Sequence, residues 1–260
     1  MSTSPQFFTS IIDRYLSEPH ASLLNGILFG IDLKASPNFY NDIKTVGLLH
    51  LVVLSGINVT MLCAIVSGVT HNFGKRASIL ITILTVVLFI LFVGPKAPIV
   101  RAGVMGILTF VAIIKGRRNF TLYALIISLL FITVFFPKWI STVSLQLSYA
   151  ATIGIILFGQ TSSKNRIWQE LKISLAAQLL TTPIIFIYFR QISLIAPLSN
   201  LLVAPLIPVL MVLGFITAIL GKIDYSLGLI PAQLCYGILA YIVWIIEVLA
   251  DLPFIFHQFN

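Results

Sequence analysis

Long runs of uncharged, mostly apolar residues constrain this chain more than any other feature of its sequence. Charged residues make up 9% of the 260 residues, whereas hydrophobic residues make up 58%. Soluble domains carry about 25% charged residues, and they need polar side chains to cover their surface. A water-soluble globule is therefore excluded, and the outer surface must face lipid.

These runs have the length of membrane-spanning helices. A helix needs about 20 apolar residues to cross a bilayer, whereas a transmembrane β-barrel would show alternating segments of about ten residues. The runs are continuous, so the sequence predicts an all-α, polytopic membrane protein with about eight spanning helices, some of them broken or re-entrant. The predicted spans are 47–70, 77–94, 98–114, 120–136, 142–160, 171–189, 197–220 and 229–249.

The spans predict three parts of the chain. Residues 1–45 form an N-terminal segment, residues 46–250 a transmembrane domain, and residues 251–260 a C-terminal tail. The apolar stretch 21–31 is too short to cross a bilayer and is typical of an interfacial or re-entrant helix. Residues 1–20 lack a basic region followed by an apolar core, so no cleavable signal peptide is expected.

Basic residues are distributed unequally between the predicted loops, and the formal net charge is +8. One alternate set of loops carries Lys75, Arg76, Lys115, Arg117, Arg118, Lys164, Arg166, Lys172 and Lys222; the other carries Lys96, Lys138 and Arg190. The positive-inside rule predicts that the first set is cytoplasmic. Across the cell's inner (cytoplasmic) membrane, both termini would then be extracytoplasmic. The positive charge would also suit a polyanionic cargo, and composition does not choose between these explanations.

Polar residues within apolar runs are the candidates for function, because lipid tolerates them poorly. The run Gly47–Leu62 holds His50, Ser55, Gly56 and Asn58. A helix break at Ser55-Gly56 could line a cavity. Alternatively, these residues serve helix packing and the membrane interface.

Arg101 lies about one turn into the predicted span 98–114. A guanidinium at the centre of a membrane helix costs about 2.5–3.5 kcal/mol, which invites a functional explanation. The alternative is that Arg101 extends to the outer headgroups.

Three later segments contain further polar residues, and two of them also contain prolines. Ser144, Gln146 and Ser148 lie near the start of one predicted helix, where interhelical hydrogen bonding is the favoured interpretation over a functional role. Gln178, Asn200 and Pro205 lie in two proline-containing runs with Thr182, Pro183, Pro197 and Pro208. Prolines beside polar residues indicate broken helices, which often mark substrate paths.

Four of these motifs, in this order, resemble the membrane core of the ComEC competence family, which moves single-stranded DNA across the cytoplasmic membrane in natural transformation. They are GLLHLVVLSGINV, VRAGVM, LQLSYAATIG and PLSNLLVAPLIP, within about residues 23–212. The resemblance implies a DNA path or structural motif formed by His50, Ser55, Gly56, Asn58, Arg101, Gln146, Ser148, Gln178, Asn200 and Pro205. Gly47 and Pro197 also occupy motif positions. Asn58 stands where the family usually has His.

The resemblance also sets limits. Full-length members usually add an OB-like domain and often a metallo-β-lactamase-like nuclease domain, and neither fits these 260 residues. No His-x-His-x-Asp-His pattern occurs, and Cys63 and Cys235 make no metal-ligand pattern. We therefore expect no enzymatic activity, no metal and no other cofactor in this chain.

The predicted function is a channel for single-stranded DNA. No phosphate-binding Gly-Lys-Ser/Thr loop is present, so the resemblance implies a separate cytoplasmic ATP-driven translocase, with separate DNA-receptor and nuclease components. One alternative is a secondary transporter of a small anionic solute. Another is an intramembrane hydrolase using Ser55 and His50, although five residues along a helix place them about 140° apart.

Overall fold

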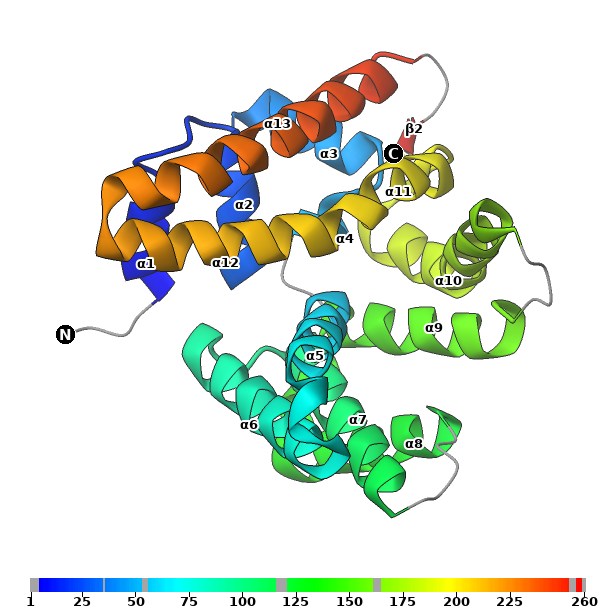
Figure 1. Cartoon of the computed structure of the whole chain (residues 1–260). Helices are drawn as coiled ribbons and strands as arrows, with labels where there is room; N and C mark the ends of the chain where they lie inside the picture. Colours follow the sequence, from blue (N-terminus) through cyan, green and yellow to red (C-terminus); the bar gives the residue numbers. More distant parts are fainter. Residues whose placement is uncertain are drawn as a thin grey trace. The chain divides into compact units, whose positions relative to one another are not determined.

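The structure is a computed structural model that describes residues 5–34, 36–52, 56–115, 121–160, 165–252 and 256–258. Within these ranges the chain is helical, apart from a pair of short antiparallel strands (Figure 1). Strand β1 (Gln191–Ser193) pairs with β2 (Phe256–Gln258) in the register Ile192 to His257. The predicted all-helical membrane fold is confirmed, and the small strand pair is an addition to it.

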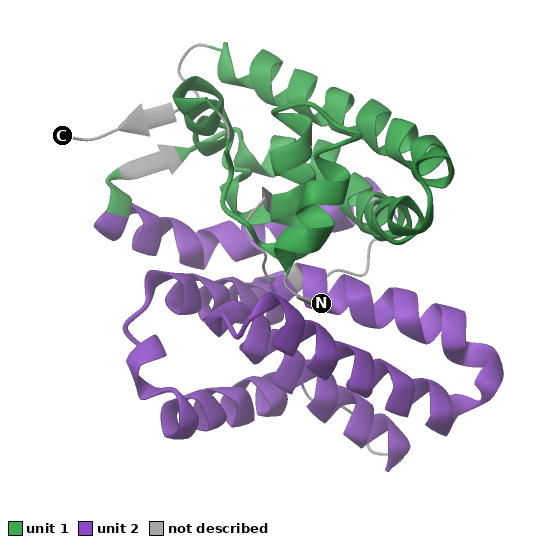
Figure 2. Cartoon of the chain, turned by 90° about the vertical axis from the view of Figure 1, so that its left-hand side faces the viewer, with its two compact units in different colours: residues 1–54, 189–260 green, residues 55–188 purple. Residues whose placement is uncertain are grey.

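By its contacts the chain divides into two compact units (Figure 2), which are described separately. Unit 1 comprises residues 1–54 and 189–260, and unit 2 comprises residues 55–188. The helices of unit 1 are α1 (Pro5–Ile12), α2 (His20–Phe29), α3 (Pro37–Thr45), α4 (Leu49–Val52), α11 (Ala196–Val203), the 3-10 turn η3 (Ala204–Leu206), α12 (Ile207–Ile223) and α13 (Tyr225–Ala250).

The core of unit 1 forms where α2 packs against α12 and α13. Every residue of α2 after His20 is buried, as expected of a helix that is apolar on all sides. Gly214 of α12 permits this approach, since a Cβ there would lie 2.7 Å from Leu28 Cδ1. The predicted helix at 21–31 is thus present at 20–29, and its depth in the membrane stays a prediction.

Unit 2 is built around one central helix. Its elements are α5 (Gly56–Thr70), the 3-10 turn η1 (His71–Phe73), α6 (Lys75–Val93), α7 (Ala97–Ile114), α8 (Thr121–Phe135), the 3-10 turn η2 (Pro137–Trp139), α9 (Val143–Phe158) and α10 (Arg166–Phe189), whose last residue belongs to unit 1. Helix α7 contacts α5, α6, α8 and α9. Gly103 allows α6 to come close, because a Cβ there would lie 2.5 Å from Ile90 Cδ1.

Five of the described segments are long and apolar enough to cross a membrane: 75–93, 97–114, 167–189, 196–223 and 225–250. Large apolar side chains such as Leu84 of α6 and Leu130 of α8 are exposed, which suits a lipid-facing surface. The other three predicted spans coincide with α5, α8 and α9. These helices have 15, 15 and 16 residues, fewer than the about 20 that a full crossing needs. Eight complete crossings therefore remain a prediction.

The predicted continuous helix 47–70 is wrong in one respect. Gly47 has φ +76°, and the amides of Gly47 and Leu48 bond back to the carbonyls of Lys44 and Ile43, closing the end of α3 in a Schellman turn. Helix α4 then covers Leu49–Val52, and α5 begins at Gly56. Residues 53–55 lie outside the described ranges.

Of the helix breaks predicted at prolines, one is present and one is absent. The predicted break around Pro205 is confirmed, because η3 separates α11 from α12. The predicted break around Pro183 is wrong, since α10 continues through it. A proline removes one backbone donor, whereas unwinding would expose several backbone groups to hydrocarbon.

Candidate functional site

The most unusual side chain in unit 2 is a buried cation near the start of α7. Pro98 occupies the first turn of this helix, where its fixed φ is compatible with helical geometry. Arg101 follows three residues later and is only 7% exposed. A guanidinium held among protein side chains does not fit the alternative in which Arg101 extends to the headgroups.

One side of this guanidinium is held firmly. Arg101 Nη1 donates a hydrogen bond to Thr152 Oγ1 of α9 at 2.9 Å and contacts Met105 Sδ at 3.3 Å. The Thr152 hydroxyl in turn donates to the carbonyl oxygen of Ser148 at 2.8 Å. Ser148, a predicted site residue, therefore supports Arg101 through its backbone, one turn before Thr152.

An aromatic ring supports the same cation. The Cζ atom of Arg101 lies 5.5 Å from the centroid of the Tyr149 ring, within the range of a cation–π interaction. The Tyr149 hydroxyl lies 3.0 Å from Ser128 Oγ, and Ser128 donates to the Leu125 carbonyl oxygen at 2.7 Å. Helices α8 and α9 thus hold the ring beside α7.

The other side of the guanidinium has a donor that no described residue of the chain accepts. Arg101 Nε is buried and has no hydrogen-bond partner among the described residues. Nη2 faces Gly56, since a Cβ at Gly56 would lie 3.1 Å from it. Across the described ranges, Arg101 makes no ion pair with a carboxylate. A buried cation without a counter-ion is unfavourable, so this arrangement suits an anion supplied from outside the chain.

A second group of predicted residues lies in unit 1. His50 is exposed, and its Nδ1 lies 3.0 Å from the Gly47 carbonyl oxygen. Gly47 is packed against α11, because a Cβ there would lie 2.5 Å from Ala196 Cβ. Buried Ser199 donates to the Val46 carbonyl oxygen at 2.7 Å and Ser193 to that of Thr45 at 2.6 Å. These contacts stabilise the C-terminal end of α3.

The remaining predicted residues lie on several elements. Asn58 of α5 is buried, and Pro205 is exposed in η3. Gln146 Nε2 donates locally to the Ile140 carbonyl oxygen at 3.4 Å. Asn200 lies on α11, and Gln178 lines a groove of unit 2 described below. Ser55 lies outside the described residues, so the hydrolase alternative has no geometry to support it.

Sequence reasoning missed Thr152 and Ser128. Thr152 follows Ser148 by four residues, so helical spacing could have placed both on one face of α9. No comparable signal marks Ser128, whose contact depends on how α8 packs. Among the described residues, no group of three His, Cys, Asp or Glu side chains could hold a metal ion.

Ionisable groups outside the spans show one clear electrostatic relationship. In α3, burial raises the pKa of the Asp42 carboxyl above its ordinary value, and the nearby negative charge of Asp251, at the end of α13, raises it further. This pair lies in unit 1 and is separate from the Arg101 site.

The fold and the buried arginine together define a helical, multi-span membrane protein with a polar interior site. The chain belongs to the Competence protein family, whose sequence pattern matches residues 27–260. It is 30% identical over 169 residues to ComE operon protein 3 of Bacillus subtilis (strain 168), covering 62% of this chain and 21% of that protein. It is also 30% identical over 178 residues to an uncharacterized protein of Aquifex aeolicus (strain VF5), covering 68% of this chain and 41% of that protein.

The chain therefore spans between about a fifth and two fifths of the length of these curated relatives. No solved structure matches it. The family resemblance suggested by the four sequence motifs is confirmed.

Proposed function

We propose that this chain forms part of a channel that carries single-stranded DNA across the cytoplasmic membrane during DNA uptake in competence. The observation that carries the proposal is the buried guanidinium of Arg101, which has no carboxylate partner in the described chain. A phosphodiester would supply the missing negative charge and could accept from Nε and Nη2 together, because arginine binds phosphate through two parallel donors.

The rest of the site suits a DNA strand that must be released after it binds. A polyanion in transit needs contacts strong enough to admit it and weak enough to release it. Arg101 offers one fixed cation, and Tyr149 offers an aromatic face beside it. Single strands are bound by such combinations without regard to sequence. In this proposal the chain conducts the strand and catalyses no reaction.

The wider assembly is also part of the proposal. A separate ATP-driven translocase on the cytoplasmic side would pull the strand, and separate receptor and nuclease components would deliver it. In this proposal both termini face the extracytoplasmic side, and the unequal loop charges support that orientation.

Uptake of a fluorescent oligothymidylate into vesicles containing the full chain tests this function. We expect uptake by the wild type and at least a tenfold slower rate for Arg101→Ala. Lys138→Ala is the charge-matched control, because it removes an exposed cation from η2 and should leave uptake unchanged. Equal uptake by Arg101→Ala and wild type would overturn the role of Arg101. If the vesicles take up a small anion but do not take up the oligonucleotide, the result would instead favour the secondary transporter.

A further inference from the structure

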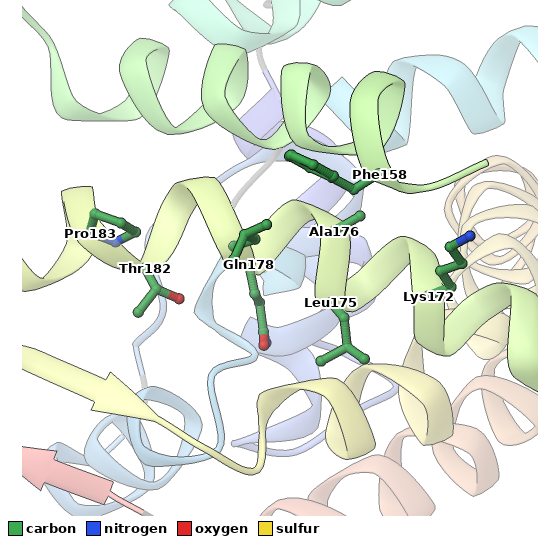
Figure 3. Close-up of a pocket in the computed structure, with 8 residues that line it drawn as sticks. Phe158, Lys172, Leu175, Ala176, Gln178, Thr182 and Pro183 are labelled. Atoms are coloured by element: carbon green, nitrogen blue, oxygen red, sulfur yellow. The ribbon is translucent and has the colours of Figure 1, made fainter. Parts of the chain in front are cut away.

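A groove on unit 2 has features that DNA conduction does not explain. It has a volume of about 560 Å³ and is lined by Phe158 of α9 and by one face of α10. The α10 residues on that face are Lys172, Leu175, Ala176, Gln178, Leu179, Thr182 and Pro183. Figure 3 shows Lys172 at one end of this row, and Thr182 and Pro183 at the other. The groove is therefore an apolar slot with a cation at one end.

Close packing of two helices forms the back of the groove. A Cβ at Gly154 of α9 would collide with the Ala176 carbonyl oxygen of α10, so only glycine permits this crossing. Phe158, one turn further along α9, lies between the two helices (Figure 3). The two helices therefore approach closely at Gly154, beside the slot.

The length of the slot matches one leaflet of a bilayer. From Lys172 to Pro183 the helix rises about 16 Å at 1.5 Å per residue. This is close to half of the about 30 Å hydrocarbon thickness. Lys172 lies on the N-terminal side of the middle of the span 167–189, and Pro183 lies beyond the middle. A chain lying in the slot would run inward from Lys172 and past the middle of this span.

The charge at the interfacial end is available to a ligand. Lys172 Nζ donates to the Gln160 carbonyl oxygen, which holds the ammonium beside the end of α9. An ammonium has three donors, so two remain for another acceptor. Glu170 is exposed and lies two positions away, where helical side chains do not face each other. The positive charge of Lys172 is thus uncompensated by its neighbour.

We propose that this groove binds an anionic phospholipid, with an acyl chain along Leu175, Leu179 and Pro183 and the headgroup phosphate at Lys172. The apolar walls favour an acyl chain over a nucleotide, whose sugar and base edges would find few polar partners there. Leu175 and Leu179 are more than half exposed, so binding would cover apolar surface. The groove is distinct from the Arg101 guanidinium, and Gln178, one of the family motif positions, is among its lining residues.

Native mass spectrometry of the full chain in detergent tests the proposal with phosphatidylglycerol and phosphatidylethanolamine of equal chain length. We expect the anionic lipid to bind about fivefold more tightly, the effect of one lysine near a membrane surface. Lys172→Gln should abolish this preference, whereas Lys138→Gln should keep it. Leu179→Trp fills the slot but keeps the charge of Lys172, so it should weaken the binding of both lipids.

Thermal unfolding of each variant in detergent confirms that it remains folded. Equal binding of the two lipids by the wild type would overturn the proposal. So would an unchanged preference in Lys172→Gln or unchanged binding in Leu179→Trp. An oligothymidylate that displaces the bound lipid would assign the groove to nucleic acid instead.

Discussion

The Thr152 hydroxyl accepts a hydrogen bond from Arg101 Nη1 at 2.9 Å and so ties α7 to α9. Thr152→Val keeps the side-chain shape and removes this acceptor, leaving the buried charge with one partner fewer. Hydrogen bonds to charged groups contribute about 1.5–3 kcal/mol, so we expect a lower unfolding temperature in detergent. Thr152→Ser should restore most of the loss. A Thr152→Val variant as stable as wild type would show that this bond does not position Arg101.

Gly56 keeps space beside the guanidinium, and this can be tested with two glycines of the same helix. A Cβ at Gly56 would lie 3.1 Å from both Arg101 Nη2 and Ala102 Cβ, whereas a Cβ at Gly68 would meet nothing within 4 Å. Gly56→Ala should therefore reduce oligonucleotide uptake severalfold. Gly68→Ala should leave uptake unchanged and stabilise α5 by up to about 1 kcal/mol. Equal uptake by the two variants would refute a role for the space at Gly56.

Gly47, in the turn that ends α3, should tolerate substitution less well than Gly74, which follows η1. The φ of +76° at Gly47 disfavours any side chain, and a Cβ would also lie 2.5 Å from Ala196 Cβ. Gly74 has φ +87° and ψ 152°, a region that essentially only glycine adopts, but open space around it, so Gly74→Ala measures a backbone term alone, about 1–3 kcal/mol. We expect Gly47→Ala to lower the unfolding temperature further, because overpacking adds about 1–3 kcal/mol. Equal losses for the two variants would mean that contact with α11 is unimportant.

Asp42 should make stability depend on pH. Burial and Asp251 raise its pKa in the folded chain, so the folded state binds the proton more tightly than the unfolded state. The stabilisation from this bound proton is fully present below about pH 3.9, the pKa of an aspartate in the unfolded chain. It is lost as the pH rises through the raised pKa of Asp42 in the folded chain. Asp42→Asn should therefore raise the unfolding temperature at pH 7, and the gain in the free energy of unfolding should be less than about 1 kcal/mol for so exposed a pair.

The advantage of Asp42→Asn should disappear as the pH falls below about 4. Asp32→Asn, which removes an exposed carboxyl before α3, is the control. A benefit of Asp42→Asn that persists at low pH would point to a cause other than charge.

The helices were predictable because lipid imposes a simple rule on sequence. A span must be apolar for most of its length, so the charge-free runs locate most of the long apolar helices to within a few residues, whereas the short helices α1, α3 and α4 were not predicted. Arg101 could be singled out for the same reason, since a charge within such a run demands an explanation. The turn at Gly47 was not predicted, because an apolar run does not show where a positive φ ends one helix and another begins.

The environment of Arg101 depends on packing that hydropathy does not encode. Gly56 of α5 and Thr152 of α9 lie beside Arg101, and Ser128 of α8 holds Tyr149 next to it. Their sequence separations from Arg101 give no indication of proximity. Pro183 misled the prediction because proline marks a break in water more reliably than in hydrocarbon. The groove between α9 and α10 likewise depends on one glycine crossing, Gly154 against Ala176, which only the folded chain shows.

The salt dependence of oligothymidylate binding tests most directly whether Arg101 pairs with a DNA phosphate. For single strands, the slope of log K against log salt concentration falls by about 0.7 for each phosphate neutralised. We expect Arg101→Ala to bind more weakly and to have a slope smaller in magnitude by about 0.7, with Lys138→Ala unchanged. A slope identical to that of wild type in Arg101→Ala would show that Arg101 does not pair with a DNA phosphate.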